Sequence, residues 1–307
     1  QNHEEDRSSE ENVKMVPFYM KQKVNMGMAC GIIACVHSVM NNHDLVELRE
    51  NSVLDKFYCA SMGLDPNEKA DLMNQLKELN AEHVGALLVE PIQGRGGKVV
   101  PPDGFLAKLR AWCDANDVVL IYDEVYSGFN RTGKMFACDW EGVAPDMICL
   151  GKSLSGGYPI SACVGKAAVM DAWPKSEGEA LHTSTFLGNP VGCAMAVASL
   201  QAHATDQVQG EVEAKAELLR EMLNQIKSPL IHEVRGRGLM LGMELRHADG
   251  SAAGDVAGSV LVKMMQQGVF MLADGAEGNV LAFTPPFVIN EEEMKYAMQR
   301  LQSALDR

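Results

Sequence analysis

Short apolar runs alternate with longer amphipathic segments along the middle of this chain. Strands are predicted at 84–89, at 118–122 and in the run that ends at Leu150, with a helix at 104–115 between the first two. Short buried strands that alternate with helices are typical of a mostly parallel sheet. The pattern therefore predicts an α/β core whose successive strands end at one edge.

The pattern changes in the C-terminal part of the chain. A small apolar helix is predicted at 188–200 and an amphipathic helix at 211–226, whose apolar side chains fall on one side. After Pro229 the predicted order is strand, strand, helix at about 253–267, strand, and a last helix from Glu291. This order predicts a small α+β domain that follows the α/β core.

The N-terminal part is less regular. Residues 1–12 are polar and acidic and are expected to be disordered. A short strand is predicted at 15–20, a buried helix at 29–41, and a further helix with Asp65 as its N-cap and Pro66 in its first turn.

Composition excludes several classes of function. The chain has 307 residues, of which 41 are acidic and 27 basic, and a formal net charge of −14. This charge argues against nucleic acid or an anionic membrane as partner, and no apolar run is long enough to span a bilayer. The eight cysteines lack paired zinc spacing, so we expect no metal site and reduced thiols in a cytoplasmic protein.

Two of the predicted strands end in residues that carry chemistry. One ends at Asp123, followed by Glu124, and the other ends at Gly151 and Lys152. The carboxyl ends of strands in an open α/β sheet are where ligands bind. A lysine that forms a Schiff base and an aspartate that holds a pyridinium nitrogen are the minimum for pyridoxal phosphate chemistry. Taken singly, each has a plainer interpretation as a solvated lysine or an ordinary strand-end carboxylate.

The order and spacing of several motifs add to this hypothesis. They resemble the class III (ω-) aminotransferases of fold type I in the segments 86–94, 123–125, 128–133, 151–152 and 184–190, and residues 235–240 resemble the start of that family's small domain. The resemblance implies a three-layer α/β fold type I core dependent on pyridoxal 5'-phosphate over about 76–228, with a small C-terminal α+β domain at 229–307.

The resemblance also implies a role for each matched residue. Lys152 would form the Schiff base and move the proton, and Asp123 would keep the pyridine nitrogen protonated. Val125 would pack on one face of the ring, while Tyr126 stands where the family commonly has glutamine near the ring hydroxyl. Thr185 matches a threonine that reaches the phosphate of the neighbouring subunit's cofactor, which implies a homodimer.

The substrates implied are an amino donor, either an amine or an ω-amino acid, and a 2-oxo acid acceptor. Arg95 stands where many family members have a glutamate, and Ala282 stands where they have its partner arginine. Arg95 either binds a substrate carboxylate bidentately or faces solvent. We therefore expect poor use of glutamate and 2-oxoglutarate, and better use of donors with a remote amine or of acceptors such as pyruvate.

Residues 13–75 do not match the aminotransferase motifs. They resemble a fragment of a ubiquitin C-terminal hydrolase, with Cys30 as the nucleophile at a helix start and Gln22 as the oxyanion donor. The family's Gly-(Ser/Thr)-Glu-Ala phosphate loop is not in the sequence, so an incomplete core with impaired transamination is expected. The alternative function is a ubiquitin-directed cysteine hydrolase or an inactive fusion product.

Overall fold

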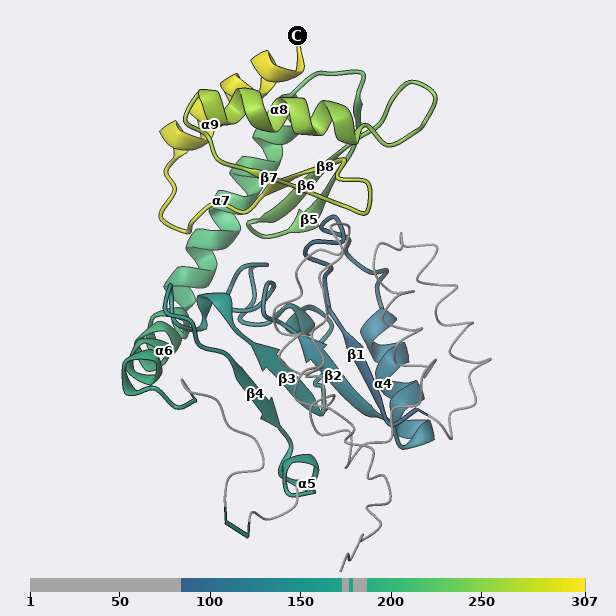
Figure 1. Cartoon of the computed structure of the whole chain (residues 1–307), viewed down its shortest axis with the longest axis vertical. Helices are drawn as coiled ribbons and strands as arrows, with labels where there is room; N and C mark the ends of the chain where they lie inside the picture. The colour runs from purple at the N-terminus through teal and green to yellow at the C-terminus, as the bar shows by residue number, and fades with distance from the viewer. Residues whose placement is uncertain (1–83, 173–176, 179–186, 307) are drawn as a thin grey trace, which may run out of the picture.

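The computed structural model describes residues 84–172, 177–178 and 187–306 of the chain (Figure 1). The strand, the helices and the tail expected at 1–80 lie outside these residues, as do Gln22 and Cys30. No helix in the described part is long and apolar enough to cross a membrane.

The first sheet, called here the N-terminal sheet, has the order β1-β2-β3-β4. Its strands are β1 (Ala86–Val89), β2 (Val119–Asp123), β3 (Met147–Leu150) and β4 (Ala162–Gly165). The first three run parallel, as the sequence predicts, whereas β4 is antiparallel to β3. Strand β4 is not predicted from the sequence, because it is four residues long and its central pair is exposed.

Helix α4 (Phe105–Asn116) connects β1 to β2 and covers part of this sheet (Figure 1). Gly104 precedes the helix and Asp117 follows it, and both have a left-handed backbone, with φ of 76° and 53°. Its buried face packs against strand β2 in a cluster that includes Phe105, Leu109 and Leu120. The remaining short helices of this region are η2 (Ala137–Trp140), η3 (Lys152–Leu154) and α5 (Ala167–Met170).

Two consecutive helices lead to the second sheet. Helix α6 (Pro190–His203) starts at Asn189, whose side chain accepts the N–H groups of Val191 and Gly192 over 3.0 and 3.3 Å. Helix α7 (Asp206–Gln225) starts at Thr205, whose hydroxyl accepts the N–H of Val208. In Figure 1, α7 runs from the side of the N-terminal sheet up to the second sheet.

The second sheet, called here the C-terminal sheet, is antiparallel with the order β5-β6-β8-β7. Its elements are β5 (Ile231–Arg237), β6 (Met240–Leu245), α8 (Gly254–Gln266), β7 (Leu272–Asp274), β8 (Val280–Phe283) and α9 (Glu291–Leu305). The sequence predicts a single strand between the two last helices, and the structure has two. Strand β7 has only three residues, and Gly275 and Gly278 in the turn that follows it have positive φ. The sequence from β7 to β8 therefore has the pattern of a single strand.

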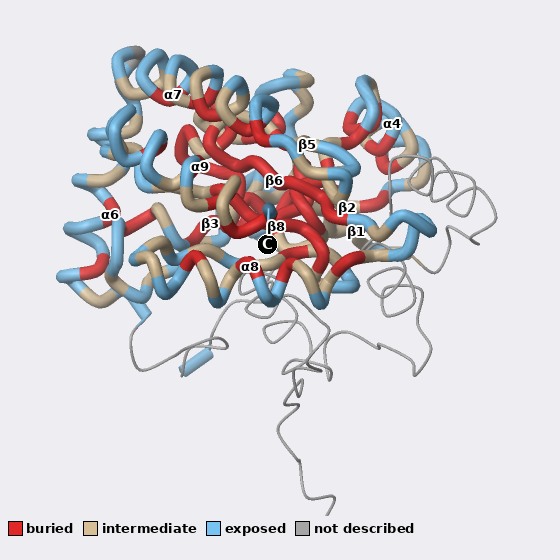
Figure 2. Tube along the Cα trace, turned by 90° about the horizontal axis from the view of Figure 1, so that it is seen from above, coloured by how far each residue is buried: buried red, intermediate tan, exposed pale blue. Residues whose placement is uncertain are grey.

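Helices α7, α8 and α9 cover the C-terminal sheet and form its core. The buried cluster includes Leu219 of α7, Leu241 of β6, Met264 of α8 and Leu301 of α9. Figure 2 shows buried positions concentrated along β6 and β2, whereas α6 is mostly exposed. The strand ends of the N-terminal sheet that face this second region carry the residues considered next.

Candidate active site

The parallel pairing of β2 and β3 brings two of the proposed functional residues together. Asp123, the last residue of β2, lies opposite Cys149 of β3. The N–H of Glu124 donates to the carbonyl of Cys149 over 3.0 Å and extends this pairing. Lys152 follows the end of β3 after one glycine. The same edge of the sheet therefore holds a carboxylate and an amine.

Lys152 combines a strained backbone with an amine that makes no hydrogen bond to the residues that the structure describes. Its φ is 44°, in the left-handed region that residues with a Cβ rarely adopt. Its side chain is exposed, and its Nζ lies 4.9 Å from the centroid of the Tyr126 ring. Backbone strain of this kind concentrates at functional sites.

Asp123 is buried, and its carboxylate is incompletely satisfied. Its Oδ1 accepts the N–H of Val125 over 3.0 Å, and no described residue donates to its Oδ2. Burial raises the pKa of Asp123, while the Val125 N–H and the charge of Lys152 act in the opposite direction. A buried carboxylate of this kind is stabilised by a cation placed beside it.

The residues around Asp123 hold the end of β2 in place. A Cβ added at Gly151 would lie 3.2 Å from Cγ1 of Val125, so the glycine allows the two strand ends to approach. Glu124 is buried and accepts hydrogen bonds from the Ser127 hydroxyl and from the N–H of Cys138. Burial raises the pKa of Glu124 to about 7, and these hydrogen bonds oppose the rise.

Tyr126 lies beside two lysine amines. The centroid of its ring is 4.9 Å from Nζ of Lys152 and 4.2 Å from Nζ of Lys98. Its hydroxyl accepts a hydrogen bond from Lys98 over 3.0 Å and lies 3.4 Å from Oγ1 of Thr284. The hydroxyl therefore points toward the C-terminal sheet, and its proposed contact with a cofactor ring hydroxyl stays a prediction.

Sequence reasoning missed two charged residues of this site, Lys98 and Asp274. Lys98 is fully buried and donates to Oδ2 of Asp274 over 2.6 Å and to the carbonyl of Gly94 over 3.3 Å, besides Tyr126. Asp274 ends β7 and also has no exposed side-chain surface. The sequence carried one weak signal, the apolar pair Val99-Val100 directly after Lys98, which is unusual for a solvated loop.

Arg95 is not simply a solvent-facing residue. Its Nη1 forms an ion pair with Oδ1 of Asp274, and its side chain retains 36% exposure. Ala282, at the position where the family has the partner arginine, is buried in β8 and pairs with Gly242 and Leu272. The two substituted positions therefore differ in environment, and Arg95 alone presents a charge.

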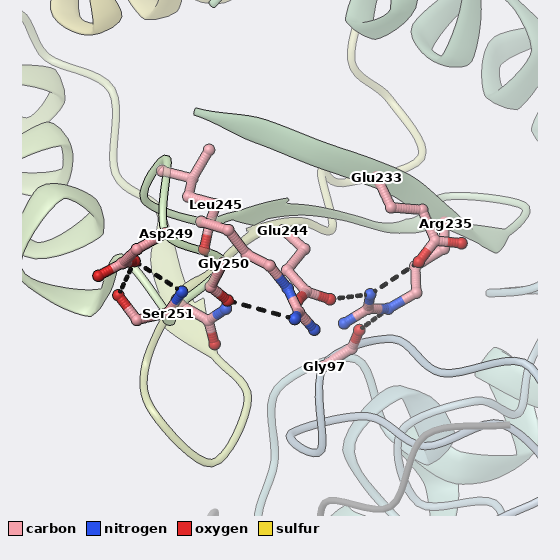
Figure 3. A network of polar contacts seen from close by, with 10 residues as sticks. Gly97, Glu233, Arg235, Glu244, Leu245, Asp249, Gly250 and Ser251 are labelled. Atoms are coloured by element: carbon pink, nitrogen blue, oxygen red, sulfur yellow. Dashed lines mark hydrogen bonds and ion pairs between the residues drawn. The ribbon is translucent and has the colours of Figure 1, made fainter. Parts of the chain in front are cut away.

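The loop that carries Arg95 and Lys98 is hydrogen-bonded to residues of the C-terminal sheet and of its turn. Figure 3 shows Arg235 of β5 between Glu233, Glu244 and the carbonyl of Gly97, to which its Nε donates over 2.8 Å. The N–H of Gly275 donates to the carbonyl of Arg95 over 3.0 Å. These contacts fix the loop at the joint between the two sheets. Thr185, in contrast, lies outside the described residues.

Comparisons with known proteins identify the family of this chain. Residues 32–305 match the family Aminotransferase class-III. The chain belongs to the class III aminotransferases. The family's cofactor is pyridoxal phosphate, and its members adopt the fold type I architecture, as the sequence resemblance implies.

Several individual relatives are similar to this chain. An ornithine aminotransferase of Brevibacillus brevis is 39% identical over 232 residues, which are 75% of this chain and 54% of that protein. The structure of the ornithine aminotransferase from Toxoplasma gondii, with partial occupancy of pyridoxal phosphate at its active site, has 36% identity and a TM-score of 0.67. The match covers 79% of this chain and 55% of the Toxoplasma gondii chain. The structure of a thermostable 6-fold mutant of an ω-transaminase from Pseudomonas jessenii has 30% identity and a TM-score of 0.70, and the match covers 78% of this chain and 55% of that one.

This class III chain spans about half the length of the curated relatives it matches. The family match begins at residue 32, within the segment 13–75 that resembles a ubiquitin hydrolase. The relatives above are all aminotransferases and lend that second resemblance no support.

The described residues fit the two ends of pyridoxal phosphate that carry its reactivity. Lys152 has an amine without a hydrogen-bond partner among them, as a covalent link to the cofactor requires. Asp123 is a buried carboxylate that accepts one described hydrogen bond, from the N–H of Val125, and a protonated ring nitrogen beside it would supply both a further hydrogen bond and a positive charge. The fit rests on these two observations.

Proposed function

We propose that this protein catalyses pyridoxal phosphate-dependent transfer of an amino group between an amine or ω-amino acid and a 2-oxo acid. The observation that carries the proposal is that Lys152 and Asp123 lie on adjacent strand ends, and that the Lys152 amine makes no hydrogen bond to the described residues. Ornithine, N-acetylornithine and ω-transaminases among the relatives support the same reaction class.

Each residue has a separate task in this proposal. When bound, the cofactor supplies an electron-withdrawing ring that stabilises negative charge on the substrate carbon. Lys152 would hold the cofactor through its amine, and the same amine would move a proton to or from that substrate carbon. Asp123 holds the proton on the ring nitrogen, because a buried carboxylate favours a cation beside it. Val125 packs beside the ring, and Arg95 receives a substrate carboxylate.

A homodimer is part of the proposal. Apolar side chains are exposed on α6 and β4, including Val191, Val197, Leu200 and Val164. Contiguous exposed apolar surface commonly marks an interface. The proposed contact of Thr185 with a neighbouring subunit's cofactor would use such an interface. The cytoplasmic location is also part of the proposal, because cysteines scattered without paired spacing are typical of reduced intracellular thiols.

The test is to incubate the full chain with pyridoxal phosphate, reduce it with borohydride and map the labelled peptide. We expect the label on Lys152, its loss in Lys152→Ala, and its retention in Lys166→Ala, which removes an exposed lysine from the same region. A label on Lys98 or Lys166 in the unmodified chain would refute the assignment. The same titration measures cofactor affinity, and so tests the expected impairment.

A further inference from the structure

A cluster of charged residues lies at the joint between the two sheets and consists of Arg95, Lys98 and Asp274. The charges of these three residues do not sum to zero. Asp274 gives one oxygen to each cation: Oδ1 to Arg95 and Oδ2 to Lys98. Its side chain is buried completely, as is that of Lys98. One carboxylate faces two cations, so the cluster keeps one positive charge in excess.

The excess charge is accessible at Arg95 and not at Lys98. Lys98 has three donors and uses them on Asp274, on the Tyr126 hydroxyl and on the carbonyl of Gly94. Arg95 has five donors, of which the described residues engage one nitrogen, and 36% of its side chain is exposed. An incoming anion would therefore meet the free side of the Arg95 guanidinium.

The fold is shaped to bring Lys98 into this position. Its φ is 58°, and its N–H donates to the carbonyl of Gly94 over 3.2 Å, so the loop turns the side chain inward. A Cβ at Gly242 of β6 would come within 3.0 Å of Cγ of Lys98, so the glycine provides the space for the lysine stem. A buried lysine is costly unless its charge is paired, and here the pairing is with Asp274.

We propose that Lys98 is a specificity-determining positioning residue: by neutralising Asp274 it leaves Arg95 free to bind the carboxylate of a substrate. Without Lys98, Asp274 and Arg95 would form a closed one-to-one ion pair, and a substrate carboxylate would have to compete with Asp274. The cluster therefore selects amino donors or acceptors that carry a carboxylate over simple amines, and this differs from the poor use of glutamate and 2-oxoglutarate expected from the sequence. This inference rests on the proposed function, because it assigns the substrate group that Arg95 receives.

Calorimetric titration of the full chain, saturated with pyridoxal phosphate, with glutarate and with uncharged glutaramide tests the inference. We expect the chain to bind glutarate and not glutaramide, and Arg95→Gln to weaken glutarate binding about tenfold or more, as the loss of a charged hydrogen-bond partner predicts. Lys98→Met should weaken it to a similar degree. Lys108→Met, which removes an exposed lysine from α4, is the matched control and should leave the affinity unchanged.

Restoring the charge balance separates this role from a structural one. The double variant Lys98→Met with Asp274→Asn should bind glutarate about as tightly as the unmodified chain, and Asp274→Asn alone should bind it at least as tightly. A purely structural role for Lys98 predicts that the double variant is no better than Lys98→Met, and that result would overturn the inference. Equal binding of glutarate by Arg95→Gln and the unmodified chain would do the same.

The borohydride label on Lys152 is scored in every sample. If Lys152 is labelled but the affinity for glutarate is the same in the Arg95 and Lys98 variants as in the unmodified chain, this inference is refuted and the proposed reaction stands. If the label is absent while the pattern of glutarate affinities holds, the proposed reaction fails and the anion site stands. Circular dichroism and urea unfolding of each variant establish that it is folded.

Discussion

The two sheets of this chain bury their residues to different degrees. In the C-terminal sheet, every residue of β6 and β8 is buried, and three helices close over the sheet. In the N-terminal sheet, the central pair of β4 is exposed, with Val164 at 54%, and the neighbouring helix α6 has few buried positions. The C-terminal region is therefore a closed hydrophobic unit, whereas the N-terminal region has an apolar face that the described residues do not cover.

The chemistry follows the same division. Strained or charged residues gather at the strand ends of the N-terminal sheet, where Lys152 has a left-handed backbone and Asp123 and Glu124 are buried acids. The C-terminal sheet contributes Asp274 and Arg235, which hold the loop of Arg95 and Lys98. The N-terminal region therefore supplies the candidate pair Lys152 and Asp123, and the more fully buried C-terminal region holds the loop that carries Arg95 and Lys98.

The largest expected effect compares the same substitution in the two regions. Leu241→Ala in the closed core should lower the free energy of unfolding by about 2–5 kcal/mol, through lost burial and the cavity that remains. Leu200→Ala on α6, where the leucine is 39% exposed, should cost less than about 1 kcal/mol. Urea unfolding midpoints at unchanged slope measure both. Similar losses for the two variants would show that the outward face of α6 is covered.

A smaller effect concerns the buried acids of the N-terminal sheet. Folding raises the pKa of Glu124 from 4.5 to about 7, so the folded state holds the proton more tightly than the unfolded state. Its contribution to stability is therefore complete below the unfolded pKa and is lost as pH rises toward 7, by up to about 3 kcal/mol at about 1.4 kcal/mol per unit.

Unfolding experiments between pH 4 and 8 should show this decline, and Glu124→Gln should remove much of it. Burial also raises the pKa of Asp123, so a shallower decline in the same direction should remain in that variant. A Glu124→Gln variant with an unchanged pH profile would contradict the assignment of the decline to Glu124.

The smallest expected effect is that of Val164→Thr on β4. Because the valine is 54% exposed, the substitution should change the free energy of unfolding by less than about 0.5 kcal/mol. The matched change Val260→Thr, at a position of α8 that is 1% exposed, buries a hydroxyl and should cost about 1–3 kcal/mol. Measurement at two protein concentrations sharpens the comparison, since a dimer across β4 would make the cost of Val164→Thr depend on concentration.

Local patterns in the sequence determined most of the secondary structure of the described part. Apolar runs predicted β1, β2 and β3, amphipathic periodicity predicted α7, and helices were also predicted at the places of α4, α6, α8 and α9. Parallel pairing then brings Asp123 and Lys152 to one edge, so the central pair of the candidate site could be located without a structure.

The tertiary structure alone decided the rest. Strands β4 and β7 are too short for a periodic signal, and they exist because β3 and β8 offer them hydrogen-bonding edges. Lys98 and Asp274 lie 176 positions apart, and no local pattern relates them. A lysine is buried only where a distant carboxylate pairs with it, so its environment depends on how the two sheets meet. The sequence by itself therefore determined most of the elements and the place of the candidate pair, and the meeting of the two sheets decided which charges surround that pair.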